Sequence, residues 1–90
     1  MQKTIITVVG KDTVGIIARV CTYLADNNIN ILDITQTIID GFFNMMMIVD
    51  MTGSDKSLGE IQSDLEATGK EMGLMIKAQH EEIFDMMHRI

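Results

Sequence analysis

The residues with the clearest capacity for chemistry lie between Gly10 and Ile16, where two glycines flank a short polar turn. Apolar, β-branched residues precede this turn, and a helical pattern follows it. Without a Cβ, Gly10 and Gly15 let the main chain turn sharply and approach a ligand closely. The unpaired N–H groups that begin the helix can bind a carboxylate or a phosphate. The turn therefore indicates a small-ligand pocket; a plain strand-to-helix connection, with Asp12 or Thr13 as the N-cap, is the alternative.

Nucleotide and metal sites find weaker support. Four residues separate Gly10 from Gly15, as in a phosphate-binding loop, but Ile16 and Ile17 stand where that loop has a lysine and a hydroxyl residue. A nucleoside triphosphate is therefore disfavoured. No cysteine and histidine spacing matches a zinc site, and core packing explains the nine methionines better than copper(I) binding does. We expect neither a metal nor another cofactor.

Catalysis requires a nucleophile, a base and an orienting group within hydrogen-bond reach. The two histidines, His80 and His88, fall at the end of the last predicted strand and in the C-terminal tail. The single cysteine, Cys21, has the helical spacing of a buried thiol and cannot form an internal disulfide. We therefore expect a protein that is not an enzyme and has no catalytic residues.

A small zwitterion suits the predicted pocket better than a nucleotide does. Its carboxylate would accept hydrogen bonds from the N–H groups of residues 13–16. Its ammonium group would bind Asp12 or the side-chain oxygen of Asn30, which opens the second predicted strand. The alternative role of Asn30 is that of a turn residue.

Composition and charge narrow the class of protein. Ninety residues make one domain with a single core, and 47% hydrophobic and 22% charged residues are typical of a globular chain. The formal net charge is −6 and the basic residues are scattered, so we expect no nucleic acid to bind. There is neither a signal-peptide pattern nor an apolar run long enough to cross a membrane. We expect a cytoplasmic protein without membrane contact.

Hydrophobic periodicity and turn signals predict the elements of the fold. Asp40–Gly41 is a hairpin turn signal, which pairs Gln36 with Met45 and Leu32 with Val49. A capping box at Ser57–Glu60 begins the second helix, and Gly73 ends it. The predicted elements are strand 4–9, helix 14–26, strands 30–39 and 42–51, helix 57–72, strand 74–79 and a short helix in 81–90. The hairpin gathers one apolar face made of Leu32, Ile34, Ile38, Phe43, Met45, Met47 and Val49.

This order predicts an α+β, ferredoxin-like βαββαβ fold, with a four-stranded antiparallel sheet, two helices on one face and a short C-terminal helix. Residues 1–80 form the domain, and residues 81–90 form the helical tail. The helix-free face carries apolar residues that predict an interface, covered by the tail or by a second copy. We favour a homodimer. These residues are Ile39, Phe42, Met46 and Ile48.

The element order, the pattern Gly10-x-Asp12-x-x-Gly15-Ile16 and the pair Asn30-Ile31 resemble the ACT domain family. The resemblance covers about residues 3–80 and is strongest to small stand-alone bacterial and archaeal proteins related to the glycine-cleavage repressor type. It implies a ligand site between the first strand-helix loop of one copy and the second strand of its neighbour. The positions assigned to the ligand are Gly10, Lys11, Asp12, Thr13, Val14, Gly15, Ile16, Asn30 and Ile31.

The resemblance implies a regulatory domain that binds an amino acid or similar metabolite, acts as a homodimer and signals through a protein partner. The alternative is an interaction module that docks another protein on the open sheet face, with no small ligand. The sequence departs from the family at Val14, where many ACT loops carry a proline before the second glycine. The N–H of Val14 stays available, and the loop is less rigid.

Overall fold

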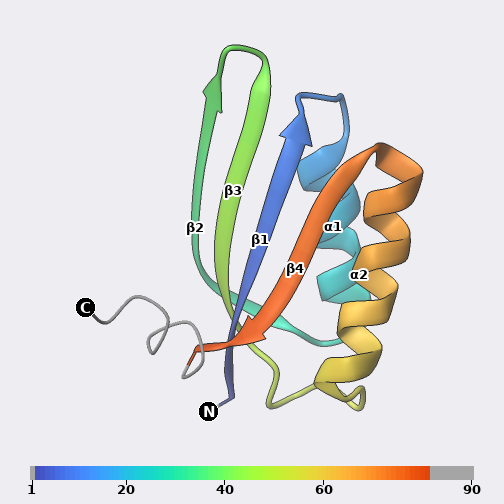
Figure 1. Ribbon diagram of the computed structural model, residues 1–90. Coiled ribbons are helices and arrows are strands. Elements are labelled where there is room, and N and C mark those ends of the chain that lie inside the picture. Colours follow the sequence, from blue (N-terminus) through green and yellow to red (C-terminus); the bar gives the residue numbers. More distant parts are fainter. Residues whose placement is uncertain (1, 82–90) are drawn as a thin grey trace.

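The computed structural model describes residues 2–81, which form a four-stranded sheet with two helices on one face (Figure 1). In chain order the elements are β1 (Lys3–Lys11), α1 (Ile16–Asp26), β2 (Asn30–Ile39), β3 (Phe42–Asp50), α2 (Leu58–Met72) and β4 (Leu74–His80). The strand order is β2-β3-β1-β4, and all neighbouring strands are antiparallel. The predicted ferredoxin-like fold is confirmed. Beyond Glu81, the predicted helical tail and His88 lie outside the described residues.

Local sequence signals set both ends of α2. The Ser57 hydroxyl accepts a hydrogen bond from the Glu60 N–H at 3.2 Å, and Glu60 Oε1 accepts one from the Ser57 N–H at 3.1 Å. This reciprocal capping box satisfies two otherwise unpaired donors. Gly73 ends the helix in the left-handed conformation, with φ 72°. Both predicted ends of this helix are confirmed.

The core lies between the sheet and the two helices. Alternate residues of β3 point into it, as expected for a strand with one covered face. Met45 and Met47 are among them, so these two methionines serve packing. Four other elements contribute to the core: Ile6 and Val8 of β1, Ile16, Val20 and Leu24 of α1, Ile61 and Leu65 of α2, and Leu74, Ile76 and Ala78 of β4; Ile29, just before β2, is also buried there.

The pairing of β2 with β3 follows the predicted register only in part. It runs as predicted from Ile39–Phe42 to Asp33–Ile48 and then shifts, so that Ile31 lies opposite Val49. The predicted pair Leu32–Val49 was therefore wrong. A β-bulge places an extra residue in β2, and counting by twos along the chain cannot reveal it.

The helices leave most of β2 uncovered. Every residue from Leu32 to Ile39 is exposed in this strand, which forms one edge of the sheet. Leu32, Ile34 and Ile38 are 40%, 42% and 57% exposed, so the part of the predicted apolar face that β2 contributes is not buried in the single chain. The hairpin pattern fixes which side chains share a face, but only the placement of the helices decides which of them are buried.

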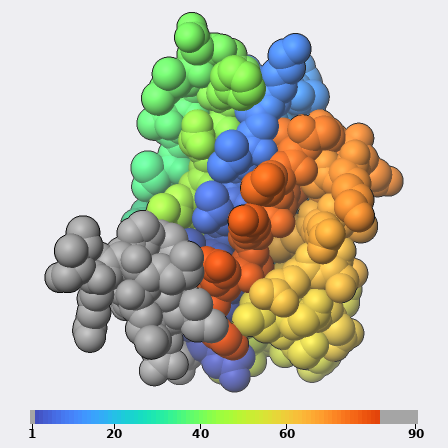
Figure 2. All heavy atoms as spheres, viewed as in Figure 1, coloured from blue at the N-terminus to red at the C-terminus, as the bar shows by residue number. Residues whose placement is uncertain are grey.

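Figure 2 shows the other face of the sheet, which carries no helix. Ile39, Phe42 and Met46 are exposed there, and Ile48 is half-buried, so the predicted apolar residues do lie on the uncovered face. Within the described part of the chain, no helix has the length and apolar character needed to cross a membrane.

Candidate functional site

Backbone hydrogen bonds fix the loop between β1 and α1 at both ends. The Asp12 N–H donates to the Gly41 carbonyl at 2.9 Å, which ties the loop to the β2–β3 turn. The Thr13 hydroxyl donates to the Lys11 carbonyl at 3.1 Å. At the other end, the Arg19 N–H donates to the Gly15 carbonyl at 2.9 Å. The loop is therefore held between the tip of the hairpin and the first turn of the helix.

Gly15 is the N-cap of α1 and has φ 90°, in the left-handed region that favours glycine. The alternative interpretation, with Asp12 or Thr13 as the N-cap, does not hold, because Gly15 is the N-cap and no side chain caps the helix. The N–H groups of the first helical turn have no intrahelical acceptor. With no capping side chain on them, they are available to an anion.

A hollow of about 310 Å³ lies between this loop, the first turn of α1 and β2. Its polar side chains come from two walls: Asp12 and Thr13 from the loop, and Gln36 from β2. Its size is near the lower end of pockets that bind small molecules. The lining residues are Asp12, Thr13, Gly15, Ile16, Ile17, Ala18, Gln36, Ile38 and Phe43.

The predicted ligand residues of the loop separate into two groups. Lys11 and Val14 do not line the hollow, and Val14 is 98% exposed. At Gly10 an added Cβ would lie 3.2 Å from Cα of Leu74 and 3.3 Å from the Gly73 carbonyl oxygen, so the close approach of the β4 backbone favours a residue without a Cβ. The predicted residues that do line the hollow are Asp12, Thr13, Gly15 and Ile16.

Asn30 and Ile31 lie at the far end of β2 from the hollow. They pair with Asp50 and Val49. The hollow is instead reached by Gln36 and Ile38, which lie toward the turn. The fold of one chain therefore does not bring Asn30 to the β1–α1 loop.

Sequence reasoning missed Gln36 as a site residue, although one signal was present. Gln36 is the only polar residue on the apolar face predicted for the hairpin. A lone amide among apolar side chains can donate and accept hydrogen bonds to a ligand. Ile38 and Phe43 carried no comparable signal, because only the tertiary arrangement brings them beside the loop.

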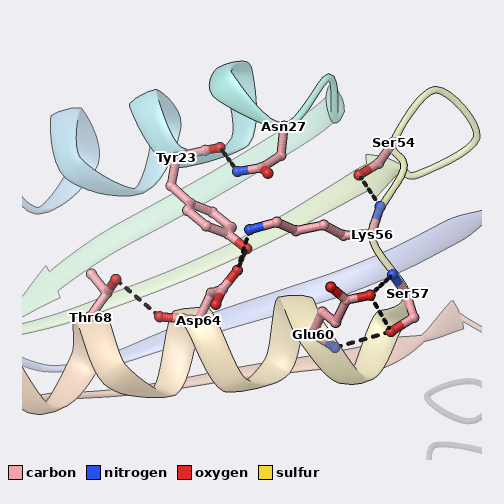
Figure 3. A network of polar contacts seen from close by, with 8 residues as sticks. All are labelled: Tyr23, Asn27, Ser54, Lys56, Ser57, Glu60, Asp64 and Thr68. Atoms are coloured by element: carbon pink, nitrogen blue, oxygen red, sulfur yellow. Dashed lines mark hydrogen bonds and ion pairs between the residues drawn. The ribbon is translucent and has the colours of Figure 1, made fainter.

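A second polar cluster joins the two helices (Figure 3). The Tyr23 hydroxyl donates to Asp64 Oδ2 at 2.5 Å, and Lys56 Nζ lies 2.6 Å from the same oxygen. The hydrogen bonds from Lys56 and Tyr23 lower the pKa of the Asp64 carboxyl. Burial, together with the bond to Asp64, raises the pKa of the Tyr23 hydroxyl. Because the hydroxyl, the ammonium and the carboxylate already bond one another, the cluster connects α1 to α2 and is not a candidate substrate site.

The ferredoxin-like sheet, with a hollow beside its first strand-helix loop, agrees with the ACT domain that the sequence resemblance implied. The chain belongs to the ACT domain family, whose model, described as ACT domain, matches residues 2–79. It is 63% identical to a UPF0237 protein of Bifidobacterium longum and 43% identical to one of Methanocaldococcus jannaschii, each over 90 residues and the full length of both chains.

Solved structures agree with this assignment. An ACT domain protein from Streptococcus pneumoniae is 38% identical, with a TM-score of 0.81, over 92% of this chain and 93% of that one. A formyltetrahydrofolate deformylase from Pseudomonas syringae is 20% identical, with a TM-score of 0.83, over 89% of this chain and 28% of that one. The deformylase shares the fold alone. The predicted resemblance to the ACT domain family is confirmed.

Proposed function

We propose that this chain is a non-enzymatic, cytoplasmic regulatory domain that binds an amino acid where two copies of the chain meet. The observation that carries the proposal is the hollow itself, which brings the uncapped start of α1 and the Asp12 carboxylate together beside an exposed sheet edge. In this proposal the domain acts without catalytic residues or a cofactor, and it signals to a regulatory protein partner through its state of association.

The walls of the hollow suit the two charges of an amino acid. The ligand carboxylate would accept hydrogen bonds from the first-turn N–H groups of α1, where the helix dipole also favours an anion. The Asp12 carboxylate supplies the opposite charge for the ammonium group. On the other wall, the Gln36 amide can donate to or accept from the remainder of the ligand.

The exposed edge of β2 supports the shared interface. Ile34 and Ile38 are large apolar residues on this edge, and Ile38 also lines the hollow. A ligand that contacts both copies binds the pair more tightly than the single chain. The ligand therefore shifts the population from the single chain toward the dimer, to the extent that its affinity for the dimer is higher.

A thermal-shift screen of the twenty L-amino acids tests this proposal. A ligand at about 100 times its Kd adds about 2.7 kcal/mol of stability, which should raise Tm by roughly 10–20 °C for a domain of this size. Ala18→Gln, which fills the hollow, should abolish the shift. Ala25→Gln is the matched control, because Ala25 is an exposed residue of the same helix that does not line the hollow. No shift with any amino acid, or equal shifts in both variants, would contradict the proposal.

The helix-free face favours a second candidate, an interaction module that docks another protein and binds no small ligand. Ile39, Phe42 and Met75 are each more than half exposed on this face, and exposed apolar area often marks an interface. A negative amino-acid screen, together with tight binding of a protein partner lost in Phe42→Ser, would favour this candidate.

A further inference from the structure

Ile5 is buried on the face of the sheet that carries no helix. Side chains alternate along β1, and Ile6 and Val8 belong to the core beneath the helices, so Ile5 points to the other face. It is nevertheless only 4% exposed, although it is not one of the described residues that make up the core. Something other than the core therefore shields Ile5 from solvent.

The neighbouring strands alone do not explain this burial. Val9 provides a matched comparison, because it lies on the same face of the same central strand and also has a side chain beside it on β3 and on β4. Val9 is nevertheless 38% exposed. The flanking side chains are Asn44 and Met75 for Val9, and Ile48 and Gln79 for Ile5. The half of the helix-free face around Ile5 is therefore covered, and the half around Val9 is open.

The chain leaves the sheet beside Ile5. The last strand, β4, ends at His80, which pairs with Thr4, and Figure 1 shows this end of β4 next to the start of β1. In the following residue, Glu81, the Oε2 atom lies 3.9 Å from Nζ of Lys3. Lys3 shares the face of Ile5, because it lies two residues away along the same strand. The described chain therefore ends on the helix-free face, next to its covered half.

Residues 82–90, which follow the described part of the chain, have the length and the pattern to cover this half. A helix of nine residues is about 13.5 Å long, and the distance from β4 across β1 to β3 is about 10 Å. Ile83, Met87 and Ile90 recur at the spacing of one apolar helical face, and Asp85 falls on the opposite side of that pattern. Such a helix could cross both strands and present its apolar face to them.

We propose that residues 82–90 form an amphipathic helix that docks on the helix-free face over Ile5 and Ile48. Its apolar residues Ile83, Met87 and Ile90 face the sheet, and its charged residues face solvent. This docking is independent of the proposed function, because the hollow lies on the helix side of the sheet.

The covalent connection favours this segment over a second copy or a separate protein as the cover. A segment joined directly to Glu81 reaches the face at a high effective concentration, whereas a separate chain loses translational and rotational freedom on binding. The docked segment leaves Ile39, Phe42 and Met75 exposed. A protein partner would therefore find only the half of the face that lies toward the β2–β3 turn.

Thiol alkylation in the whole 90-residue chain tests the docking. Ile5→Cys and Val9→Cys place matched thiols on one strand, and both are made together with Cys21→Ala so that no other thiol reacts. The Ile5→Cys thiol should react at least about tenfold more slowly than the Val9→Cys thiol, because a covered thiol reacts only when its cover opens. Adding Ile83→Ser and Met87→Ser should remove most of this difference and leave the Val9→Cys rate unchanged.

Asp85→Ser is the matched control in the segment, because Asp85 lies opposite the apolar face, and it should leave both rates unchanged. Circular dichroism checks that each variant is folded. Equal rates for Ile5→Cys and Val9→Cys, or slow alkylation that persists with Ile83→Ser and Met87→Ser, would overturn the proposal. Protection of Ile5→Cys that rises with protein concentration would overturn it as well, since the cover would then be a second copy.

A second measurement needs no substitution. In the unmodified chain, nuclear Overhauser effects should connect the methyl groups of Ile5 with those of Ile83 or Met87. In a mixture of labelled and unlabelled chains, filtering for contacts between chains should remove these signals, because the contact lies within one chain. Their absence from the uniformly labelled protein, or their survival through the filter, would contradict the docking.

Discussion

The two edges of the sheet differ in how far they are covered. In β4, Leu74, Ile76 and Ala78 are buried under α2, and Gln62 Nε2 of that helix donates to the Ala78 carbonyl at 2.8 Å. Lys77 adds a charge at the middle of this strand. In β2, every residue from Leu32 to Ile39 is exposed, and none of them is basic. Covering helices and edge lysines prevent strand pairing between molecules.

This contrast identifies β2 as the edge that is available for association. A long exposed edge invites pairing with another chain unless something blocks it. The chain covers β4 with α2 and places a lysine in it, and it leaves β2 as an exposed edge with apolar side chains and a hollow beside it. In the proposed function, association and ligand binding would therefore use the same side of the molecule, so that one could control the other.

The largest expected effect is on the free energy of unfolding, which should respond differently to substitutions in the two edge strands. Ile76→Ala in β4 removes a side chain that is 6% exposed, and it should lower the free energy of unfolding by about 2–5 kcal/mol. Ile38→Ala in β2 removes one that is 57% exposed, and it should change that energy by less than about 0.5 kcal/mol in dilute, monomeric protein. Urea unfolding followed by circular dichroism measures both. Equal losses would contradict the contrast.

A smaller effect is expected for the strength of pairing. Asp33 Oδ1 occupies the Ile34 N–H, which must be released before β2 can pair. Asp33→Ala should therefore lower the Kd of the homodimer by roughly fivefold, or about 1 kcal/mol, in sedimentation equilibrium. Asp33→Asn keeps an acceptor and removes the charge, so its Kd should lie between the other two. Weaker pairing in Asp33→Ala would show that the carboxylate supports pairing along β2 and does not compete with it.

The smallest expected change in stability concerns the polar cluster of Tyr23, Lys56 and Asp64 that joins the two helices. The Asp64 carboxyl has its pKa lowered by Lys56 and Tyr23, so the cluster stabilises the fold above the unfolded pKa of about 3.9. This contribution is lost as pH falls through the lower, folded-state pKa. Asp64→Asn should be slightly less stable than wild type at neutral pH in urea unfolding, and the difference should disappear in strong acid. A difference that stays constant with pH would contradict this role.

Much of the fold could be predicted from the sequence because its signals are local. The Asp40–Gly41 turn, the Ser57 capping box and the Gly73 stop each depend on neighbouring residues. The bulge at Leu32 and the exposure of β2 could not be predicted, because both depend on how distant elements pack.

The candidate site divides in the same way. The loop wall of the hollow follows a glycine pattern and was predicted as a ligand site. The strand wall, with Gln36 and Ile38, depends on how β2 lies beside α1 in the folded chain. Asn30 and Ile31 were placed at the site through family resemblance, and the fold of one chain sets them at the other end of the strand.

Amide hydrogen exchange along β2 tests most directly whether this edge joins two copies. The amides of Thr35 and Thr37 bond to β3 within one chain, so they should be protected at every protein concentration. The amides of Gln36 and Ile38 face the open edge, and their protection should rise with protein concentration as the copies pair. If those two amides exchange as fast as unpaired ones at the highest concentration, β2 is not an interface and the account is wrong.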